Sequence, residues 1–178
     1  MKLETQRLEL VFLTAEQLML WLNDPDALMR GLDCTYAGEP LTGEFRTVLQ
    51  GQCALVRERP DAYVWLSFVL LIRRCDRVVV GSADFKGMPS ETGEVEIGYG
   101  LGEAFLRQGY MREAVEAMCA WALGQPGVRA VVAETERDNT PSQHVLAACG
   151  FTQFHKAGAQ TFWWRRDAAS CSVRAGMI

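Results

Sequence analysis

The sequence lacks both a long apolar run and a surplus of basic residues. Its 178 residues carry 18 Lys and Arg against 22 Asp and Glu, which gives a net charge of -4. Proteins that neutralise nucleic-acid phosphates usually carry a basic surplus or patch, so we expect no nucleic-acid partner. The stretch "MKLETQRLELVF" has no uninterrupted apolar region before its glutamates, so we expect neither a signal peptide nor a membrane span there. These absences predict a cytoplasmic protein without membrane contact.

Metal-binding patterns are also missing. No C-x-x-C pair occurs, and neither of the two histidines lies near a cysteine pair. Zinc sites need such closely spaced ligands, so we expect no metal site. The cysteines are instead expected to be reduced and mostly buried thiols. They are Cys34, Cys53, Cys75, Cys119, Cys149 and Cys171.

Two phosphate-binding motifs are absent or incomplete. No G-K-[ST] triplet occurs, which argues against a P-loop. Gly98 and Gly100 have the first spacing of the dinucleotide pattern G-x-G-x-x-G, but Glu103 stands at its third glycine. A carboxylate there would repel a pyrophosphate, so we expect no nicotinamide dinucleotide.

The composition is that of an ordinary globular protein, with 49% hydrophobic and 22% charged residues. No internal repeat, low-complexity segment or linker divides the chain. A chain of this length can bury a sizeable core, so we expect residues 1–178 to form one domain.

The first half reads as a strand followed by helices and then a hairpin. Thr14 and Gln17 have capping-box spacing for the first helix, and Pro25 opens the second. β-Branched and aromatic runs then favour two antiparallel strands. The predicted elements are a strand at 7–13, a helix through 21–22, a helix after 25, a helix at about 41–59, and strands at 62–72 and 77–85.

From Gly93 onward, strands and helices alternate. Thr140 is expected as the N-cap of the last helix, with Pro141 in its first turn and Gln143 as its capping-box partner. The elements are strands at 93–101 and 128–135, helices at 110–123 and 140–150, and strands at 151–157 and 160–166. The fold class is therefore α/β (α+β), with a mixed central sheet of about six to seven strands and helices on both faces.

A glycine lies between a polar turn and an amphipathic helix in "AFLRQGYMREA" (104–114). Glycine at such a junction lets the chain turn tightly and lets a ligand approach the main chain. The unpaired amides and the positive dipole end of the helix then favour an anion such as a phosphate. A lone glycine at Gly109 is also explained by the turn alone.

Two long segments resemble a known family. "VEIGYGLGEAFLRQGYMREAVEAMCAWA" (95–122) and "GVRAVVAETERDNTPSQHVLAACGF" (127–151) are similar to the central motifs of the GNAT superfamily of N-acetyltransferases. Their order and spacing resemble the branch of ribosomal-protein N-terminal acetyltransferases of RimJ/RimL type. The resemblance implies a GNAT-like sheet and transfer of acetyl from acetyl-CoA to a primary amine.

The family's pyrophosphate loop, Q/R-x-x-G-x-G/A, is only partly present. Gly109 stands at its central glycine, while Leu106 and Met111 replace the first and last residues. Arg107 is either a phosphate ligand or a solvated loop arginine. Asn139 matches a family asparagine that contacts the pantetheine arm. By resemblance, acetyl-CoA would contact Tyr99, Gly100, Leu101, Arg107, Gln108, Gly109, Tyr110, Met111, Asn139 and Ser142.

The resemblance also implies two catalytic residues. Glu96 matches the position at which some members keep a glutamate base, although a solvated or paired carboxylate explains it equally well. Ser142 matches a serine that could hydrogen-bond the thiolate, but it is also an ordinary first-turn residue. The tyrosine acid of many relatives is replaced by Leu146.

The leading hypothesis is an acetyl-CoA-dependent N-acetyltransferase that acts on a small amine or a protein N-terminus in a ternary complex. The missing tyrosine and altered loop leave two alternatives: a non-catalytic acyl-CoA-binding module or sensor, and an unrelated α/β binding protein. Trp163 and Trp164 point to opposite faces of a strand, so we expect one in the core and the other at an acceptor surface or a homodimer interface.

Overall fold

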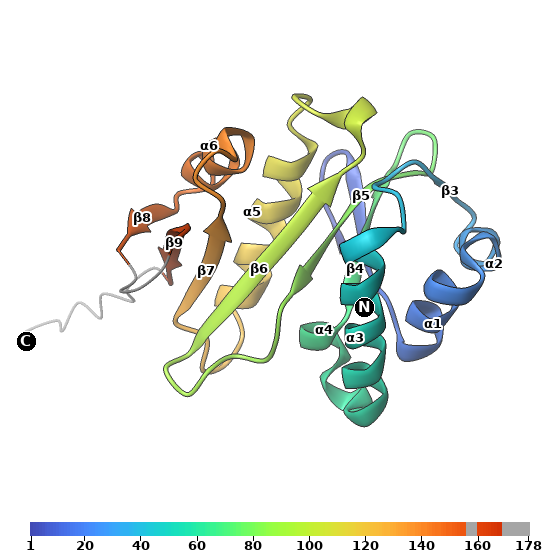
Figure 1. Ribbon diagram of the computed structural model, residues 1–178, viewed down its shortest axis with the longest axis horizontal. Helices are drawn as coiled ribbons and strands as arrows, with labels where there is room; N and C mark the ends of the chain where they lie inside the picture. Colours follow the sequence, from blue (N-terminus) through green and yellow to red (C-terminus); the bar gives the residue numbers. More distant parts are fainter. Residues whose placement is uncertain (156–159, 169–178) are drawn as a thin grey trace, which may run out of the picture.

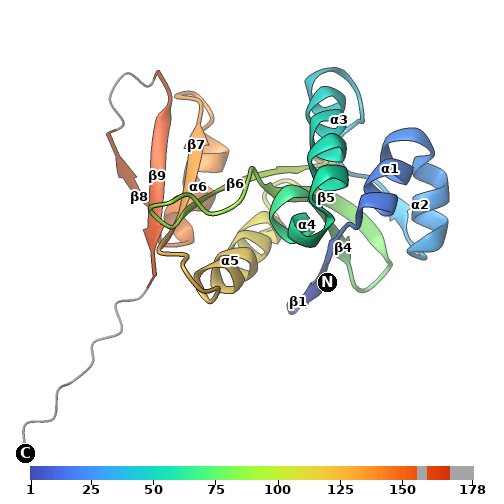
Figure 2. The same ribbon diagram turned by 90° about the horizontal axis from the view of Figure 1, so that it is seen from below.

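The computed structural model describes residues 1–155 and 160–168, which form a mixed sheet with helices on both faces (Figures 1 and 2). The described residues form nine strands, in the order β1-β2-β4-β5-β6-β7-β9-β8, with β3 on β5. The strands are β1 (Lys2–Glu4), β2 (Leu8–Phe12), β3 (Thr35–Tyr36), β4 (Phe68–Arg73), β5 (Val78–Phe85), β6 (Glu94–Leu101), β7 (Ala130–Thr135), β8 (Thr152–Phe154) and β9 (Phe162–Asp167). The predicted fold class is confirmed.

The sheet has more strands than the six to seven expected. The two additional strands, β1 and β3, are three and two residues long and are largely exposed. Leu3 and Tyr36 pack against the cores, but strands of three and two residues are too short to show a recognisable apolar alternation, and each is defined by its pairing with a neighbouring strand.

The helices begin largely where the sequence predicts. Thr14 and Gln17 form the expected reciprocal capping box, and Pro25 opens the second helix. The helices are α1 (Ala15–Asn23), α2 (Pro25–Gly31), α3 (Gly43–Glu58), α4 (Tyr63–Leu66), α5 (Tyr110–Leu123) and α6 (Thr140–Ala148), with 3-10 turns at Pro60–Ala62 and Glu103–Phe105.

Two hydrophobic cores lie on opposite faces of the sheet. Leu10 and Phe12 of β2 pack in the core that contains α5, whereas Val11 packs in the core beneath α1, α2 and α3. Successive strand residues point to opposite faces, so one apolar strand supplies both cores. Helices therefore cover both faces of the sheet, as Figure 2 shows.

The predicted strand at 62–72 is wrong at its start. The segment 62–72 does not begin as a strand, because Tyr63–Leu66 is the helical turn α4 and β4 starts only at Phe68. The turn packs Leu66 into one core and Trp65 against Phe85 and Trp121 on the other side, and this packing outweighs the local strand preference.

The N-cap of α6 is Asn139, not Thr140. The Asn139 side chain accepts a hydrogen bond from the Ser142 amide at 3.2 Å, while Gln143 donates to the carbonyls of Glu136 and Arg137. Asparagine caps a helix at least as well as threonine, so the cap moves one residue toward the N-terminus.

Candidate functional site

The site lies where β6 and β7 diverge. The two strands pair in parallel only from Glu94–Glu96 to Ala130–Val132. Beyond Glu96, β6 continues along β5 and β7 continues along β9, so the strands separate toward their carboxyl ends (Figure 1). The ladder between them has ended there, and the facing main chain is therefore open to an extended ligand.

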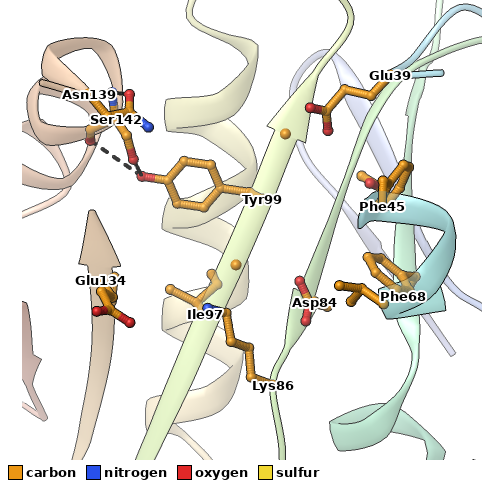
Figure 3. Close-up of a pocket in the computed structure, with 15 residues that line it drawn as sticks. Glu39, Phe45, Phe68, Asp84, Lys86, Ile97, Tyr99, Glu134, Asn139 and Ser142 are labelled. Atoms are coloured by element: carbon orange, nitrogen blue, oxygen red, sulfur yellow. Dashed lines mark hydrogen bonds between the residues drawn. The ribbon is translucent and has the colours of Figure 1, made fainter. Parts of the chain in front are cut away.

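A cavity of about 270 Å³ occupies this opening (Figure 3). One wall belongs to β6, β7 and α6, and the other to β5, the start of β4, the N-terminal part of α3 and the loop before α3. The lining residues are Glu39, Phe45, Val48, Phe68, Ser82, Asp84, Lys86, Ile97, Gly98, Tyr99, Gly100, Ala133, Glu134, Asn139 and Ser142.

Tyr99 and Ser142 bridge the opening on the β7 side. The Tyr99 hydroxyl lies 2.8 Å from Ser142 Oγ and donates to the Ser142 carbonyl oxygen at 3.3 Å (Figure 3). Burial raises the pKa of Tyr99 to about 12, although the hydrogen bond with Ser142 opposes the rise. Asn139 lines the same wall. The opening therefore contains two neutral hydroxyls and one amide.

Two carboxylates form the other wall, each beside a glycine of β6. Asp84 pairs with Gly98 across the β5–β6 ladder, and a Cβ on Gly98 would lie 2.7 Å from Asp84 Oδ1. A Cβ on Gly100 would overlap Glu39 Oε2. Burial raises the pKa of Asp84 to about 6 and also raises the pKa of Glu39. The glycines thus make room for acidic groups whose protonated form is favoured by burial.

The predicted anion-binding loop lies between the end of β6 and the start of α5. Gly109 has φ +80° and Arg107 has φ +61°, and both residues are exposed together with Gln108. Arg7 Nη1 donates to the Gln108 carbonyl oxygen at 2.9 Å, which ties the loop to the β1–β2 turn. The left-handed turn at Gly109 lets the chain enter α5 and leaves exposed main chain at the positive end of the helix.

A family model described as an acetyltransferase (GNAT) domain matches residues 7–152, most of the chain. The chain belongs to the GNAT acetyltransferase family. The predicted resemblance is thereby confirmed, and the donor that this family uses is acetyl-CoA.

Curated relatives match about half of the chain. The uncharacterized N-acetyltransferase YjdG of Bacillus subtilis is 33% identical over 94 residues, which are 53% of this chain and 56% of that protein. The FsC-acetyl coenzyme A-N(2)-transacetylase of Aspergillus fumigatus is 29% identical over 87 residues, 49% of this chain and 35% of that protein. The chain spans about half the length, or less, of these relatives.

Solved structures of acetyltransferases show the same fold. The ribosomal-protein-S5-alanine acetyltransferase of Vibrio fischeri has a TM-score of 0.66 and 16% identity, with 96% of this chain and 98% of that chain covered. The ribosomal L7/L12 α-N-protein acetyltransferase RimL, solved in complex with coenzyme A, has a TM-score of 0.65 and 18% identity, with 94% and 98% covered.

The residues at the opening fit an acyl-CoA. A pantetheine arm is an extended chain with amide groups, and β6 offers main chain along Ile97–Leu101 that does not pair with β7. Met111 does not obstruct the GNAT loop, because it lies buried in the core below α5 together with Tyr110. Leu106 is exposed, and Leu101 is partly buried against the same core.

The structure brings four of the predicted site residues together at the cavity, namely Tyr99, Gly100, Asn139 and Ser142, but places Glu96 elsewhere. Glu96 lines a second cavity of about 370 Å³, beside Glu94 and Trp163, and its carboxylate binds Lys86 Nζ at 2.8 Å. Glu94 in turn binds Arg165. The paired state that the sequence left open for Glu96 is thus observed, and the catalytic role of Glu96 stays a prediction.

Several residues at the cavity escaped the sequence analysis. Glu39, Phe45 and Phe68 come from elements whose spacing carries no motif. Asp84 did have a signal, because it is the one acidic residue in the otherwise apolar strand "VVVGSADF". A buried carboxylate is rarely retained without a partner or a function, so Asp84 could have been singled out.

The other predicted features are placed as follows. Trp164 packs in the core with α5, whereas Trp163 lines the second cavity with Phe154. Of the cysteines, Cys53, Cys119 and Cys149 are buried, Cys34 is half-buried and Cys75 is exposed, all as free thiols, while Cys171 lies outside the described residues. Within residues 1–155 and 160–168, no group of three or more metal-ligating side chains is arranged to hold a metal ion. The same residues contain no helix that is both long and apolar enough to cross a membrane.

Proposed function

We propose that the protein is an acetyl-CoA-dependent N-acetyltransferase that acetylates a primary amine while both substrates are bound. The acceptor is either a small-molecule amine or a protein or peptide N-terminus. The observation that carries this proposal is that one cavity joins the β6–β7 opening to the acidic wall of Asp84 and Glu39. A thioester and an amine can therefore meet in a single site.

The donor side is formed by residues that accept a thioester and its phosphates. Acetyl-CoA supplies an activated acetyl carbonyl when it is bound. The main chain of Tyr99–Leu101 would pair with the pantetheine arm, and the loop Arg107–Gly109 with the N-terminus of α5 would face the pyrophosphate. Asn139 and the pair of Tyr99 and Ser142 would lie near the sulfur, where a hydroxyl can hydrogen-bond a leaving thiolate.

The acceptor side favours a cationic amine. Glu39 and Asp84 place carboxylates in the cavity, and Phe45 and Phe68 add apolar surface beside them. Carboxylates attract an ammonium group, whereas an aromatic wall shields the site from water. This combination supports an acceptor whose amine is protonated in solution and is attached to an apolar or extended chain.

The test begins with thermal unfolding in the presence of acetyl-CoA or free CoA. A ligand that binds only the folded state at about 100 times its Kd adds roughly 2.7 kcal/mol to the free energy of unfolding. Thiol release is then measured with phenethylamine, 1,4-diaminobutane and peptides that begin with Ala or Ser. The peptides are included because solved neighbours carry the names of ribosomal-protein acetyltransferases.

The outcomes separate the hypotheses. A thermal shift with acetyl-CoA and amine-dependent thiol release supports the N-acetyltransferase. A shift without thiol release for any amine favours the non-catalytic acyl-CoA-binding module. Absence of any shift would contradict the proposal.

A further inference from the structure

Asp84 is the most deeply buried acid of the cavity. Only 7% of its surface is exposed, and it lies on β5, between β4 and β6 of the sheet. Burial of an ionisable group costs free energy unless the group is paired. Such a residue in a substrate cavity therefore calls for an explanation through function.

The position of the Asp84 carboxylate depends on a neighbouring glycine. Asp84 and Gly98 face each other in the β5–β6 register, and Asp84 Oδ1 would lie 2.7 Å from a Cβ at Gly98. Any larger residue at 98 would push the carboxylate away. The glycine leaves space for the Asp84 carboxylate, which lines the cavity beside the strand that carries Tyr99 (Figure 3).

The Asp84 carboxylate has weaker polar contacts than the Glu96 carboxylate. Lys86, which directly follows the end of β5, binds Glu96 of β6 at 2.8 Å. Asp84 accepts one long hydrogen bond of 3.4 Å from Gln52 of α3 at Oδ2, and no hydrogen bond to Oδ1 is found among the described residues. The other acids that line the cavity are Glu39, from the loop before α3, and Glu134 of β7. Asp84 thus has a carboxylate oxygen available to a ligand.

We propose that Asp84 is the catalytic base that takes a proton from the bound acceptor amine. This inference rests on the proposed N-acetyltransferase function. The ammonium gives one proton to Asp84, and the free amine then forms a C–N bond to the acetyl carbon as the C–S bond breaks. The second proton of the nitrogen ends on the CoA sulfur, and Asp84 returns its proton to water.

The acidity of Asp84 suits this role. Burial raises its pKa to about 6, the charge of Lys86 opposes the rise and that of Glu96 adds to it. A base is most effective when its pKa lies near the working pH, because it is then mostly ionised and still able to hold a proton. A carboxylate with an ordinary pKa would be a weaker base toward an ammonium group.

The experiment measures kcat/KM against pH for phenethylamine or, where that amine is not acetylated, for another amine of the same panel. If Asp84 receives the proton from a bound ammonium, kcat/KM rises through an apparent pKa near 6, levels off, and falls only as the free amine loses its charge. If neutral amine enters from solution without a base, kcat/KM rises steadily up to the amine's own pKa, which is about 10 for an alkylamine. The two shapes differ most between pH 6 and pH 9.

Variants test which residue causes the rise of kcat/KM near pH 6, the acidic limb of the profile. Asp84→Asn should lower kcat/KM at pH 7.5 at least tenfold and abolish the limb near pH 6, while Asp61→Asn, at an exposed acid away from the cavity, should leave both unchanged. Retention of the thermal shift with CoA verifies that Asp84→Asn is folded. Loss of the acidic limb in Glu96→Gln, with its retention in Asp84→Asn, would assign the base to Glu96 and overturn the inference.

Three further outcomes also decide the question. If Asp84→Asn does not fold, the wild-type profile is sufficient, because a steady rise to the amine's pKa overturns the inference without any variant. If the wild-type protein binds acetyl-CoA but acetylates none of the amines, the proposed function fails and the inference fails with it. If the wild-type protein is active but its pH profile lacks the acidic limb, the inference about Asp84 fails and the proposed function stands.

Discussion

The Tyr99 hydroxyl lies 2.8 Å from Oγ of Ser142, and this contact connects β6 to α6 across the opening between β6 and β7. Both hydroxyls line the cavity that also contains Asp84. The family tyrosine position on α6 is occupied by Leu146, which is fully buried in the core. A tyrosine from β6 places a hydroxyl beside Ser142, in the region where the proposed function puts the leaving thiolate.

We expect Tyr99 and Ser142 to act as a pair. Tyr99→Phe and Ser142→Ala should each lower kcat about tenfold, because a hydrogen bond to a charged group contributes on the order of 1.5–3 kcal/mol. The double variant should lose little more than either single variant, since each change disables the same pair. Thr47→Ala, which removes an exposed hydroxyl on α3, is the control. Multiplicative losses in the double variant would show that the hydroxyls act independently.

Gly109 and Gly150 provide a matched pair for testing the anion-binding loop. Their φ angles are +80° and +78°, so Ala should cost about 1–2 kcal/mol of stability at either position. Only Gly109→Ala should also reduce the thermal shift with acetyl-CoA. Gly150 follows the C-terminal end of α6, does not belong to the loop before α5, and has open space around it. Equal CoA-induced shifts in both variants would remove Gly109 from the binding site.

Asp84 should make the folded protein less stable as the pH rises. Its pKa is raised from 3.8 to about 6 by burial, so between these values the unfolded chain loses a proton that the folded protein keeps. Asp84→Asn should therefore be more stable than wild type at pH 7.5, by up to about 3 kcal/mol, and equally stable near pH 4. Denaturant unfolding at both pH values measures the difference. A gain of equal size at pH 4 would show that the effect is not caused by ionisation.

Glu113 should have the opposite dependence on pH. Burial opposes ionisation, but hydrogen bonds from Thr5 and Arg7 outweigh it and lower the pKa of Glu113. Its contribution is therefore present at neutral pH and lost as the pH falls below the ordinary value of 4.5. Because Arg7 is partly exposed, Glu113→Gln should cost only about 1 kcal/mol at pH 7.

Glu116→Gln serves as the control for this change. Glu116 is exposed on the same helix and approaches Arg112 only to 3.9 Å. A surface pair of this kind contributes at most about 0.5 kcal/mol. A loss in Glu113→Gln that stays constant down to pH 3 would contradict the ionic explanation.

Local patterns predicted the elements that have local causes. The capping box of Thr14 and Gln17 needs only residues three apart, and the apolar runs that contain β2 and β4 favoured strands. The sequence failed at Tyr63–Leu66, where aromatic and β-branched residues favour a strand but packing on both cores imposes a helical turn. It also misplaced the cap of α6, because Asn139 and Thr140 are both good caps and lie side by side.

The candidate site divides in the same way. The sequence by itself determined the family, the β6–α5 loop with Gly109 and the region of Tyr99, Asn139 and Ser142, because these features lie in two continuous segments. Only the tertiary structure decided which acid lines the cavity. The Glu96 carboxylate forms an ion pair with Lys86, whereas Asp84 lies beside Gly98 and Glu39 lies beside Gly100. Which carboxylates converge depends on strand register and on the space left by glycines, and a single stretch of sequence records neither.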